Sequence, residues 1–216
     1  MLFGSFNVRT IRNKDRLCEL ANRFEYYQMD VLSIQEHRML HSDDIRYKQC
    51  GQSSTFIHAS SSTQNSTDAT VGGVGILLSK RAMKCLIFVE KISSRIMVVT
   101  LSGNPTTTIV VVYSPTNVSD LKEVEDFYGE LGDVLTDVPA HNFLAVLGDL
   151  NAQVGKDFRS FSFHDKTNRN GEYLVDLMFC FKLTSSALNF KKKPGKLWTI
   201  TYQNGARGQI DHNLFR

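Results

Sequence analysis

Cysteine is scarce in this sequence, and no long apolar run is present. The four cysteines, Cys18, Cys50, Cys85 and Cys180, are widely spaced and form no CxxC pair. This spacing excludes a zinc knuckle and a dense disulfide framework, and it favours reduced thiols. Because no apolar run is long enough to cross a membrane and the first apolar stretch is too short for a signal peptide, we expect a nuclear or cytoplasmic protein that is not secreted.

The charge balance has no strong sign. Lys and Arg together number 25 and Asp and Glu number 22, which gives a formal net charge of +3. A mildly basic balance is compatible with a polyanionic partner but does not identify one. Hydrophobic residues make up 42% of the chain, enough for a substantial core. Since neither an internal repeat nor a linker divides the sequence, we predict a single domain over residues 1–216.

The first part of the chain has the pattern of a strand, a helix and a second strand. Residues 2–8 have a strand-like pattern, apolar residues then recur at helical spacing over residues 17–24, and residues 30–36 form a compact apolar run. Residues 52–70 are rich in Ser and Thr and have no apolar periodicity, so we predict a loop there.

The rest of the chain predicts more strands and two further helices. Segments rich in β-branched residues predict a strand meander at residues 75–79, 85–90, 95–101 and 107–113. An amphipathic helix follows over residues 121–135 with Ser119 as its N-cap, then a buried strand at 143–149 and a helix at 170–181. Three short strands are expected near Leu183, Trp198 and Gln209. These elements favour packed sheets with helices outside them.

Several apolar runs end in a polar residue of one chemical kind. These residues are Asn7, Gln35, Glu36, Tyr113, Asp149 and Asn151. Strand ends are where a rigid scaffold presents functional groups. Carboxylate and amide oxygens suit a hard cation, and no His/Cys cluster is present, so the sequence favours Mg²⁺ or Mn²⁺ over zinc.

This residue set fits the cleavage of phosphodiester bonds. That reaction needs a positioned water, a positive centre near phosphorus and a group that stabilises the leaving oxygen. Glu36 is suited to hold the metal, and Asp149 to orient the water. Each residue alone also has a structural interpretation: a solvated carboxylate for Glu36, a turn residue for Asp149 and a backbone-capping amide for Asn7. Their joint occurrence favours the catalytic interpretation.

Seven segments together resemble a known family. They are Phe6-Asn7-Val8-Arg9-Thr10, Ile34-Gln35-Glu36-His37, Gly72-Gly73-Val74-Gly75-Ile76-Leu77-Leu78, Tyr113-Ser114-Pro115-Thr116-Asn117, Gly148-Asp149-Leu150-Asn151-Ala152, Asn170-Gly171 and Gln209-Ile210-Asp211-His212. In this order, over nearly the whole chain, they resemble the endonuclease/exonuclease/phosphatase superfamily. The resemblance is greatest to the endonuclease domains of non-long-terminal-repeat retrotransposons.

The resemblance implies a fold, a cofactor and a partner. The fold would be α+β, a four-layer sandwich of two mixed β-sheets between outer helices. The cofactor would be Mg²⁺ or Mn²⁺, with Glu36 as the principal ligand and Asn7 assisting it. Arg9 stands where some relatives have an aspartate, which favours one metal ion and adds a cation for phosphate. The partner would be DNA, and a full-length element would also contain a reverse transcriptase domain.

The resemblance also implies roles for the remaining motif residues. Tyr113 would contact the scissile phosphate, Asp149 would activate the attacking water and Asn151 would bind a phosphate oxygen. Asn117 would bind phosphate or DNA, and Asp211 would orient a catalytic histidine.

That histidine belongs, in relatives, to a further Ser-Asp-His motif. The sequence reaches Arg216 without it, so we expect the last strands of the fold to be missing and a sheet edge to be unpaired. His212 does not replace it by register. We expect His212 to be a packed strand residue on the same face as Ile210 and Leu214.

Basic residues near the end of the chain have two interpretations. Lys192, within a run of three lysines, and the nearby Trp198 can bind DNA through phosphate contact and stacking, or can belong to a solvated loop and the core. Three functions follow from the whole sequence: a DNA-nicking endonuclease, a catalytically impaired module that binds nucleic acid or another partner, and a phosphatase acting on inositol lipids or sphingomyelin. The motif matches favour the endonuclease.

Overall fold

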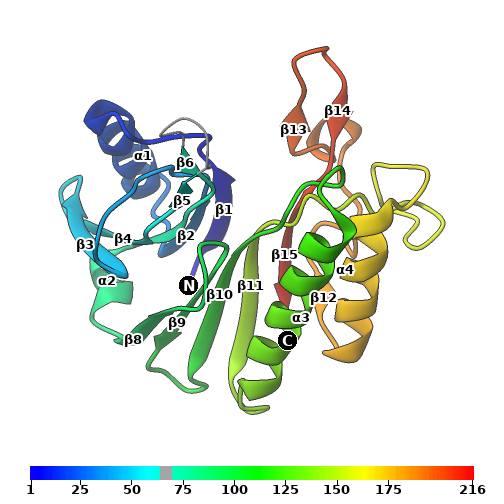
Figure 1. Cartoon of the computed structure of the whole chain (residues 1–216). Helices are drawn as coiled ribbons and strands as arrows, with labels where there is room; N and C mark the ends of the chain where they lie inside the picture. The colour runs from blue at the N-terminus through cyan, green and yellow to red at the C-terminus, as the bar shows by residue number, and fades with distance from the viewer. Residues whose placement is uncertain (64–69) are drawn as a thin grey trace. The chain divides into compact units, whose positions relative to one another are not determined.

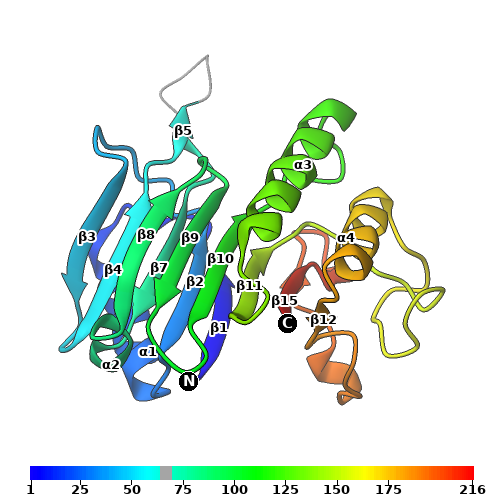
Figure 2. The same cartoon turned by 90° about the horizontal axis from the view of Figure 1, so that it is seen from below.

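The computed structural model describes residues 1–63 and 70–216, together with most of their side chains. Contacts between residues group the chain into two compact units (Figures 1 and 2). The N-terminal unit contains residues 1–113 and 141–148, and the C-terminal unit contains residues 114–140 and 149–216. Among the described residues, no helix is both long enough and apolar enough to cross a membrane.

Among the described residues, the first sheet of the N-terminal unit has five strands. Their order is β1 (Phe3–Asn7), β2 (Val31–Gln35), β7 (Val74–Leu78), β4 (Ser54–Ala59) and β3 (Ile45–Cys50). β1 and β2 are parallel, whereas the other neighbouring pairs are antiparallel. A parallel pair requires a crossover, which the helix between these two strands provides.

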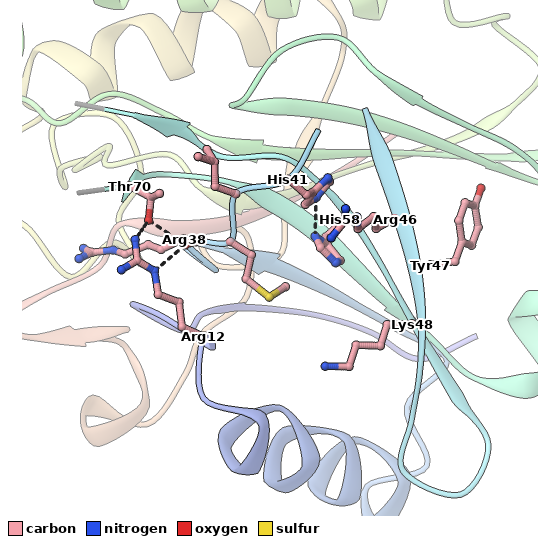
Figure 3. Close-up of a pocket in the computed structure, with 10 residues that line it drawn as sticks. Arg12, Arg38, His41, Arg46, Tyr47, Lys48, His58 and Thr70 are labelled. Atoms are coloured by element: carbon pink, nitrogen blue, oxygen red, sulfur yellow. Dashed lines mark hydrogen bonds between the residues drawn. The ribbon is translucent and has the colours of Figure 1, made fainter. Parts of the chain in front are cut away.

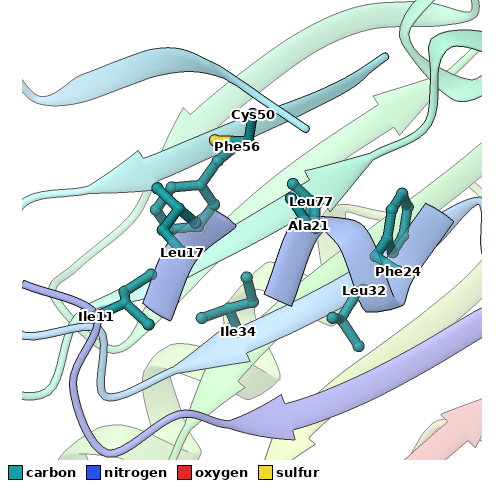
Figure 4. Packing of buried hydrophobic residues seen from close by; sticks show 9 residues of the cluster. All are labelled: Ile11, Leu17, Ala21, Phe24, Leu32, Ile34, Cys50, Phe56 and Leu77. Carbon is teal, nitrogen blue, oxygen red and sulfur yellow. The ribbon is translucent and has the colours of Figure 1, made fainter. Parts of the chain in front are cut away.

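That helix, α1 (Lys14–Tyr26), covers one face of the first sheet. It begins after Asn13, whose side chain accepts a hydrogen bond from the Asp15 N–H as an N-cap. Its buried face packs against apolar side chains of the sheet (Figure 4). The cluster consists of Ile11, Leu17, Ala21, Phe24, Leu32, Ile34, Cys50, Phe56 and Leu77. Burial of this apolar surface is what keeps the amphipathic helix on the sheet.

The second sheet packs against the first within the same unit. Its strands there are β11 (Phe143–Asp149), β10 (Thr107–Tyr113), β9 (Ile96–Leu101) and β8 (Leu86–Lys91), in that order. The Ser33 hydroxyl of β2 donates to the Leu147 carbonyl of β11 (2.9 Å). Phe3 and Phe143 also meet across the sheets, with ring centroids 6.0 Å apart. Short elements complete the unit: α2 (Lys80–Met83), β5 (Ser62–Thr63) and β6 (Thr70–Val71).

The C-terminal unit contains two longer helices and four short strands. The helices are α3 (Leu121–Asp137) and α4 (Arg169–Cys180), and the Tyr128 hydroxyl of α3 donates to the Asn170 carbonyl of α4 (3.1 Å). The strands form two antiparallel pairs, β12 (Thr184–Ser185) with β15 (Asp211–Phe215), and β13 (Ile200–Thr201) with β14 (Arg207–Gly208). A 3₁₀ turn lies at Pro194–Lys196.

The α+β class, with two sheets flanked by helices, is confirmed, but two local predictions are wrong. Residues 52–70 are not one loop, because β4 (Ser54–Ala59) lies buried between two strands of the first sheet; residues 64–69 of this segment lie outside the described residues. Ser54, Thr55 and His58 hide the apolar pattern of this strand. Ser119 is not the N-cap of α3, because the adjacent Asp120 side chain accepts from the Lys122 N–H.

Candidate active site

Two parallel strands bring Asn7 and Glu36 together. Asn7 is the last residue of β1, and it pairs in register with Gln35, the last residue of β2. Glu36 follows directly, so both side chains lie at the carboxyl ends of neighbouring strands. The Asn7 Nδ2 group donates to Glu36 Oε1 over 2.8 Å. Asn7 Oδ1 accepts from the Arg9 N–H (3.0 Å), which fixes the orientation of the amide.

Two further side chains bond the Glu36 carboxylate. The hydroxyl of Tyr113, the last residue of β10, donates to Oε1 over 3.0 Å. The guanidinium of Arg38 donates to Oε2 over 2.7 Å as an ion pair. We call Asn7, Glu36, Arg38 and Tyr113 the Glu36 cluster. Arg38 is a member that the sequence analysis missed, although its position two residues after Glu36 was available as a signal.

The surroundings of Glu36 keep its carboxyl group ionised. Burial raises its pKa, but hydrogen bonds from Asn7, Arg38 and Tyr113 lower it by more, so the net pKa lies below the ordinary value. An ionised carboxylate at neutral pH is the form that binds a hard cation.

The backbone around this cluster is strained. Arg9, Glu36 and Arg38 have φ angles of 54°, 56° and 56°, in the left-handed region that non-glycine residues rarely adopt. Asn151, in the C-terminal unit, has a φ of 46°. Such conformations cost about 1–3 kcal/mol each and are concentrated at functional sites. Four of the six non-glycine residues with positive φ among the described residues are therefore motif residues or their immediate neighbours.

Asp149 and Asn151 lie together in the C-terminal unit. Asp149 Oδ1 accepts from the Asn151 N–H (2.9 Å), and Asn151 Nδ2 donates to the Ser114 carbonyl (2.9 Å). Ser114 N–H donates in turn to the Asp149 carbonyl (2.9 Å). Asp149 is only 3% exposed, so its carboxylate is largely shielded from bulk solvent.

The glycine of the same motif has a separate packing reason. A Cβ atom on Gly148 would lie 1.9 Å from the Val112 carbonyl oxygen of β10. The backbones of β10 and β11 therefore approach too closely for any side chain there.

β15 begins with the last two motif residues, Asp211 and His212. Burial raises the pKa of Asp211. His212 is fully buried, its Nε2 donates to the Ala152 carbonyl (2.9 Å), and burial lowers its pKa to about 4. Ile210 and Leu214 are buried as well, which confirms that His212 is a packed strand residue.

The residues predicted to contact DNA have local partners in the C-terminal unit. The Asn117 carbonyl accepts from Arg169 Nη2 (2.8 Å), and its Oδ1 from the Asn170 N–H (3.4 Å), so Asn117 holds the start of α4. The Arg207 guanidinium lies over the Trp198 ring at 4.6 Å. Lys192 lies close enough to His212 for its charge to lower that pKa further. DNA contact by Lys192 and Trp198 stays a prediction.

The structure thus groups the predicted site residues within each unit. Asn7, Glu36 and Tyr113 meet in the N-terminal unit, and Asp149 with Asn151 in the C-terminal unit. Arg9 contributes its backbone N–H to the first group. Convergence of both groups with Asp211 on one phosphate stays a prediction.

The Glu36 cluster suits one hard cation rather than zinc. In the described part of the chain, no three His, Cys, Asp or Glu side chains gather as a metal-holding group. Glu36 provides the one carboxylate of the cluster, which fits Mg²⁺ or Mn²⁺ because these ions keep several waters. Both of its oxygens already accept protein donors, so a metal ion has to compete with Arg38 at Oε2.

Comparison with known proteins gives a consistent family. The model of the endonuclease/exonuclease/phosphatase family matches residues 4–212. The chain is 28% identical to craniofacial development protein 2 of Bos taurus over 225 residues, which cover 99% of this chain and 35% of that protein. It therefore spans about a third of the length of this curated relative.

Two solved structures have a similar fold. The 3′ phosphatase NExo from Neisseria, bound to a product DNA hairpin, gives a TM-score of 0.70 at 17% identity, covering 98% of this chain and 84% of that one. The endonuclease domain of TRAS1, a telomere-specific non-LTR retrotransposon, gives 0.62 at 16% identity, covering 97% and 82%. At these identities the likeness establishes the fold alone.

Proposed function

Because this chain belongs to the endonuclease/exonuclease/phosphatase family, we propose that it hydrolyses phosphodiester bonds in a nucleic-acid backbone with one Mg²⁺ or Mn²⁺ ion. The observation that supports this proposal most directly is the Glu36 carboxylate. It lies at the end of a central strand, and Asn7, Arg38 and Tyr113 keep it ionised. A single ionised carboxylate with amide support is the protein part of a hydrated magnesium site.

Each of the chain's residues has a chemical task in this proposal. A bound metal ion would supply a positive centre that polarises the phosphoryl oxygen. Glu36 would hold the ion, and Asn7 fixes the orientation of Glu36 by its Nδ2–H bond. The Tyr113 hydroxyl, which donates to Glu36 Oε1, would exchange this acceptor for a phosphate oxygen. In the C-terminal unit, Asp149 accepts a proton from the attacking water and Asn151 positions a phosphate oxygen.

We further propose DNA as the substrate and a retrotransposon-type nickase as the kind of enzyme. The motif order and the retrotransposon endonuclease fold among the structural relatives support this branch. A nickase of this type would act in the nucleus or cytoplasm, and a reverse transcriptase domain in a longer polypeptide would use the nicked end.

The direct test is the nicking of supercoiled plasmid DNA. The chain is incubated with Mg²⁺ or with EDTA, and the open-circular product is quantified. We expect nicking only with the metal ion, and its loss in Asp149→Asn. The control is Glu90→Gln, which changes an exposed carboxylate on β8. Equal nicking by Asp149→Asn and the control would refute the assignment, and release of phosphate from a 3′-phosphorylated oligonucleotide without nicking would indicate a phosphatase.

One observation favours a second candidate function, a binding module with little or no turnover. His212, the histidine of the last matched motif, is fully buried, and its Nε2 donates to the Ala152 carbonyl. His212 therefore has no access to a phosphate. Metal-dependent binding of DNA without any nicking in the plasmid assay would support this function over the first.

A further inference from the structure

A cavity of about 590 Å³ lies in the N-terminal unit, bordered by basic and histidine side chains (Figure 3). The side chains important here are Arg12, Arg38, His41, Arg46, Lys48 and His58. We call this cavity the basic pocket. No Asp or Glu among the described residues lines it. Its size falls in the range of ordinary ligand sites.

The strand register explains why this part of the sheet face is polar. Side chains two residues apart on a strand share a face, so Phe56 and His58 of β4 point the same way. On β3, Lys48 pairs with Phe56 and Arg46 pairs with His58. Phe56 belongs to the cluster beneath α1, whereas His58, Arg46 and Lys48 line the pocket. The face thus changes from apolar to basic within two residues.

The charges of the pocket are only partly neutralised. Arg46 bonds Asp43 (2.6 Å), and Arg38 bonds Glu36 (2.7 Å). Arg12 donates to the Arg38 carbonyl (2.8 Å) and to the Thr70 hydroxyl, which are neutral acceptors. In the part of the chain that the structure describes, neither Arg12 nor Lys48 has a carboxylate partner. Two uncompensated cations in a concave site attract an anion.

The two histidines of the pocket are neutral hydrogen-bonding groups at neutral pH. His41 Nε2 and His58 Nδ1 lie 3.1 Å apart and share a hydrogen bond. Burial lowers the pKa of both, that of His58 to about 3. The positive charge of the pocket therefore comes from the arginines and Lys48.

Arg38 connects this pocket with the Glu36 cluster. Its Nη2 bonds Glu36, and the same side chain lines the pocket. Its Nε is buried and has no hydrogen-bond partner among the described residues. An anion in the pocket would lie one side chain away from the metal site.

We propose that the basic pocket binds a backbone phosphate of the nucleic-acid strand that continues beyond the cleaved bond. The proposal rests on the proposed function and adds a subsite to it. A phosphodiester group matches the two uncompensated cations and the neutral donors around them.

The test measures binding without catalysis. A fluorescent DNA oligonucleotide is titrated with the full chain in EDTA, and the anisotropy gives Kd at several salt concentrations. We expect Lys48→Gln to lower the salt slope by about 0.9 and to raise Kd about eightfold at 0.1 M salt, as for one lost phosphate contact. The matched control is Lys84→Gln, which removes an exposed lysine outside the pocket. Thermal melts check the folding of both variants, and Arg12→Gln replaces Lys48→Gln if the melting temperature of Lys48→Gln falls.

The outcomes separate this proposal from the nuclease assignment. An equal change in Kd for Lys48→Gln and Lys84→Gln, or no change in either, would contradict phosphate binding in the basic pocket. Poly-glutamate of equal charge is then used as a competitor. If it displaces DNA, and if this displacement depends on Lys48 in the same way, the pocket binds polyanions in general and the nucleic-acid subsite is contradicted. If the chain nicks plasmid DNA but Lys48→Gln binds DNA as tightly as the unchanged chain, the proposed function stands and only the phosphate subsite is contradicted.

Discussion

The two units hold their motif residues in different ways. In the N-terminal unit, Asn7, Arg38 and Tyr113 bond the Glu36 side chain, so polar side chains meet one another. In the C-terminal unit, motif side chains bond the backbone, as in the bonds of Asn151 to Ser114 and of His212 to Ala152. Side chains that bond each other can exchange these partners for a ligand, whereas side chains that bond the backbone stabilise the fold. Substitutions in the Glu36 cluster should therefore change mainly activity, whereas substitutions of the motif residues in the C-terminal unit should also lower stability.

The strongest test of this contrast is the replacement of Glu36. We expect Glu36→Gln to reduce Mg²⁺-dependent nicking by about 10²–10³, because the metal ion loses its charged ligand. The melting temperature without metal should fall modestly, because the glutamine oxygen still accepts hydrogen bonds but its NH2 group faces a donor on the other side. Loss of the Mg²⁺-dependent rise in melting temperature checks the same site without activity. A variant that retains this rise would show that the metal binds elsewhere.

Acid should destabilise the folded chain through its buried histidines. The pKa is lowered to about 4 for His37 and His212 and to about 3 for His58, below the ordinary 6.5. The unfolded state therefore binds more protons, so this stability is fully present above about pH 6.5 and is lost as the pH falls. The loss by pH 5 is about 2 kcal/mol per fully buried histidine.

Urea unfolding at pH 7.5 and pH 5.0 measures this difference. His212→Gln should reduce the loss of unfolding free energy between the two pH values, whereas replacement of the exposed His141 should not. An unchanged pH dependence in His212→Gln would contradict the buried-histidine explanation.

A buried amide of the C-terminal unit should affect stability most directly. Asn170 is fully buried, and its Nδ2 donates to the Pro115 carbonyl (2.9 Å). Asn170→Ala leaves that carbonyl without its donor, so we expect a loss of about 1–3 kcal/mol in unfolding free energy. Gln203→Ala, at an exposed position, is the control for chemical unfolding. A loss of less than about 0.5 kcal/mol in unfolding free energy would contradict a stabilising role for Asn170.

The smallest expected effect concerns Arg38 and the metal ion. Arg38→Met removes the bond to Glu36 Oε2, so the metal has one competitor fewer. We expect Mn²⁺ to bind about two- to fivefold more tightly, which corresponds to a partly exposed ion pair. Titration followed by electron paramagnetic resonance of free Mn²⁺ gives the affinity. Weaker binding in Arg38→Met would mean that Arg38 orients the carboxylate rather than competing for it.

Sequence reasoning was most effective where local pattern and structure agree. The apolar spacing over residues 17–24 predicted α1, and the family resemblance implied that Asn7 assists Glu36, whose side chain it bonds. Strand β4 was missed because polar Ser54, Thr55 and His58 are buried in it, where each side chain bonds a residue outside β4. Its burial depends on tertiary contacts, which no local pattern encodes.

The basic pocket could not be predicted from the sequence for a similar reason. Its residues come from separate segments, and register places Arg46 beside His58 only after β3 pairs with β4. Arg12 reaches Arg38 across 26 residues of sequence. Each of these cations, taken alone, is an ordinary surface residue.

β3 lies at the edge of the first sheet among the described strands, and its exposed residues are Arg46, Tyr47, Lys48 and Gln49. An unpaired strand edge is a template on which a second chain can add, and edge charges oppose such addition. The lysine and arginine proposed to hold phosphate would then also keep copies of this protein apart. Charge-removing substitutions on β3 should promote aggregation on storage, and bound DNA, by shielding the same strand, should suppress it.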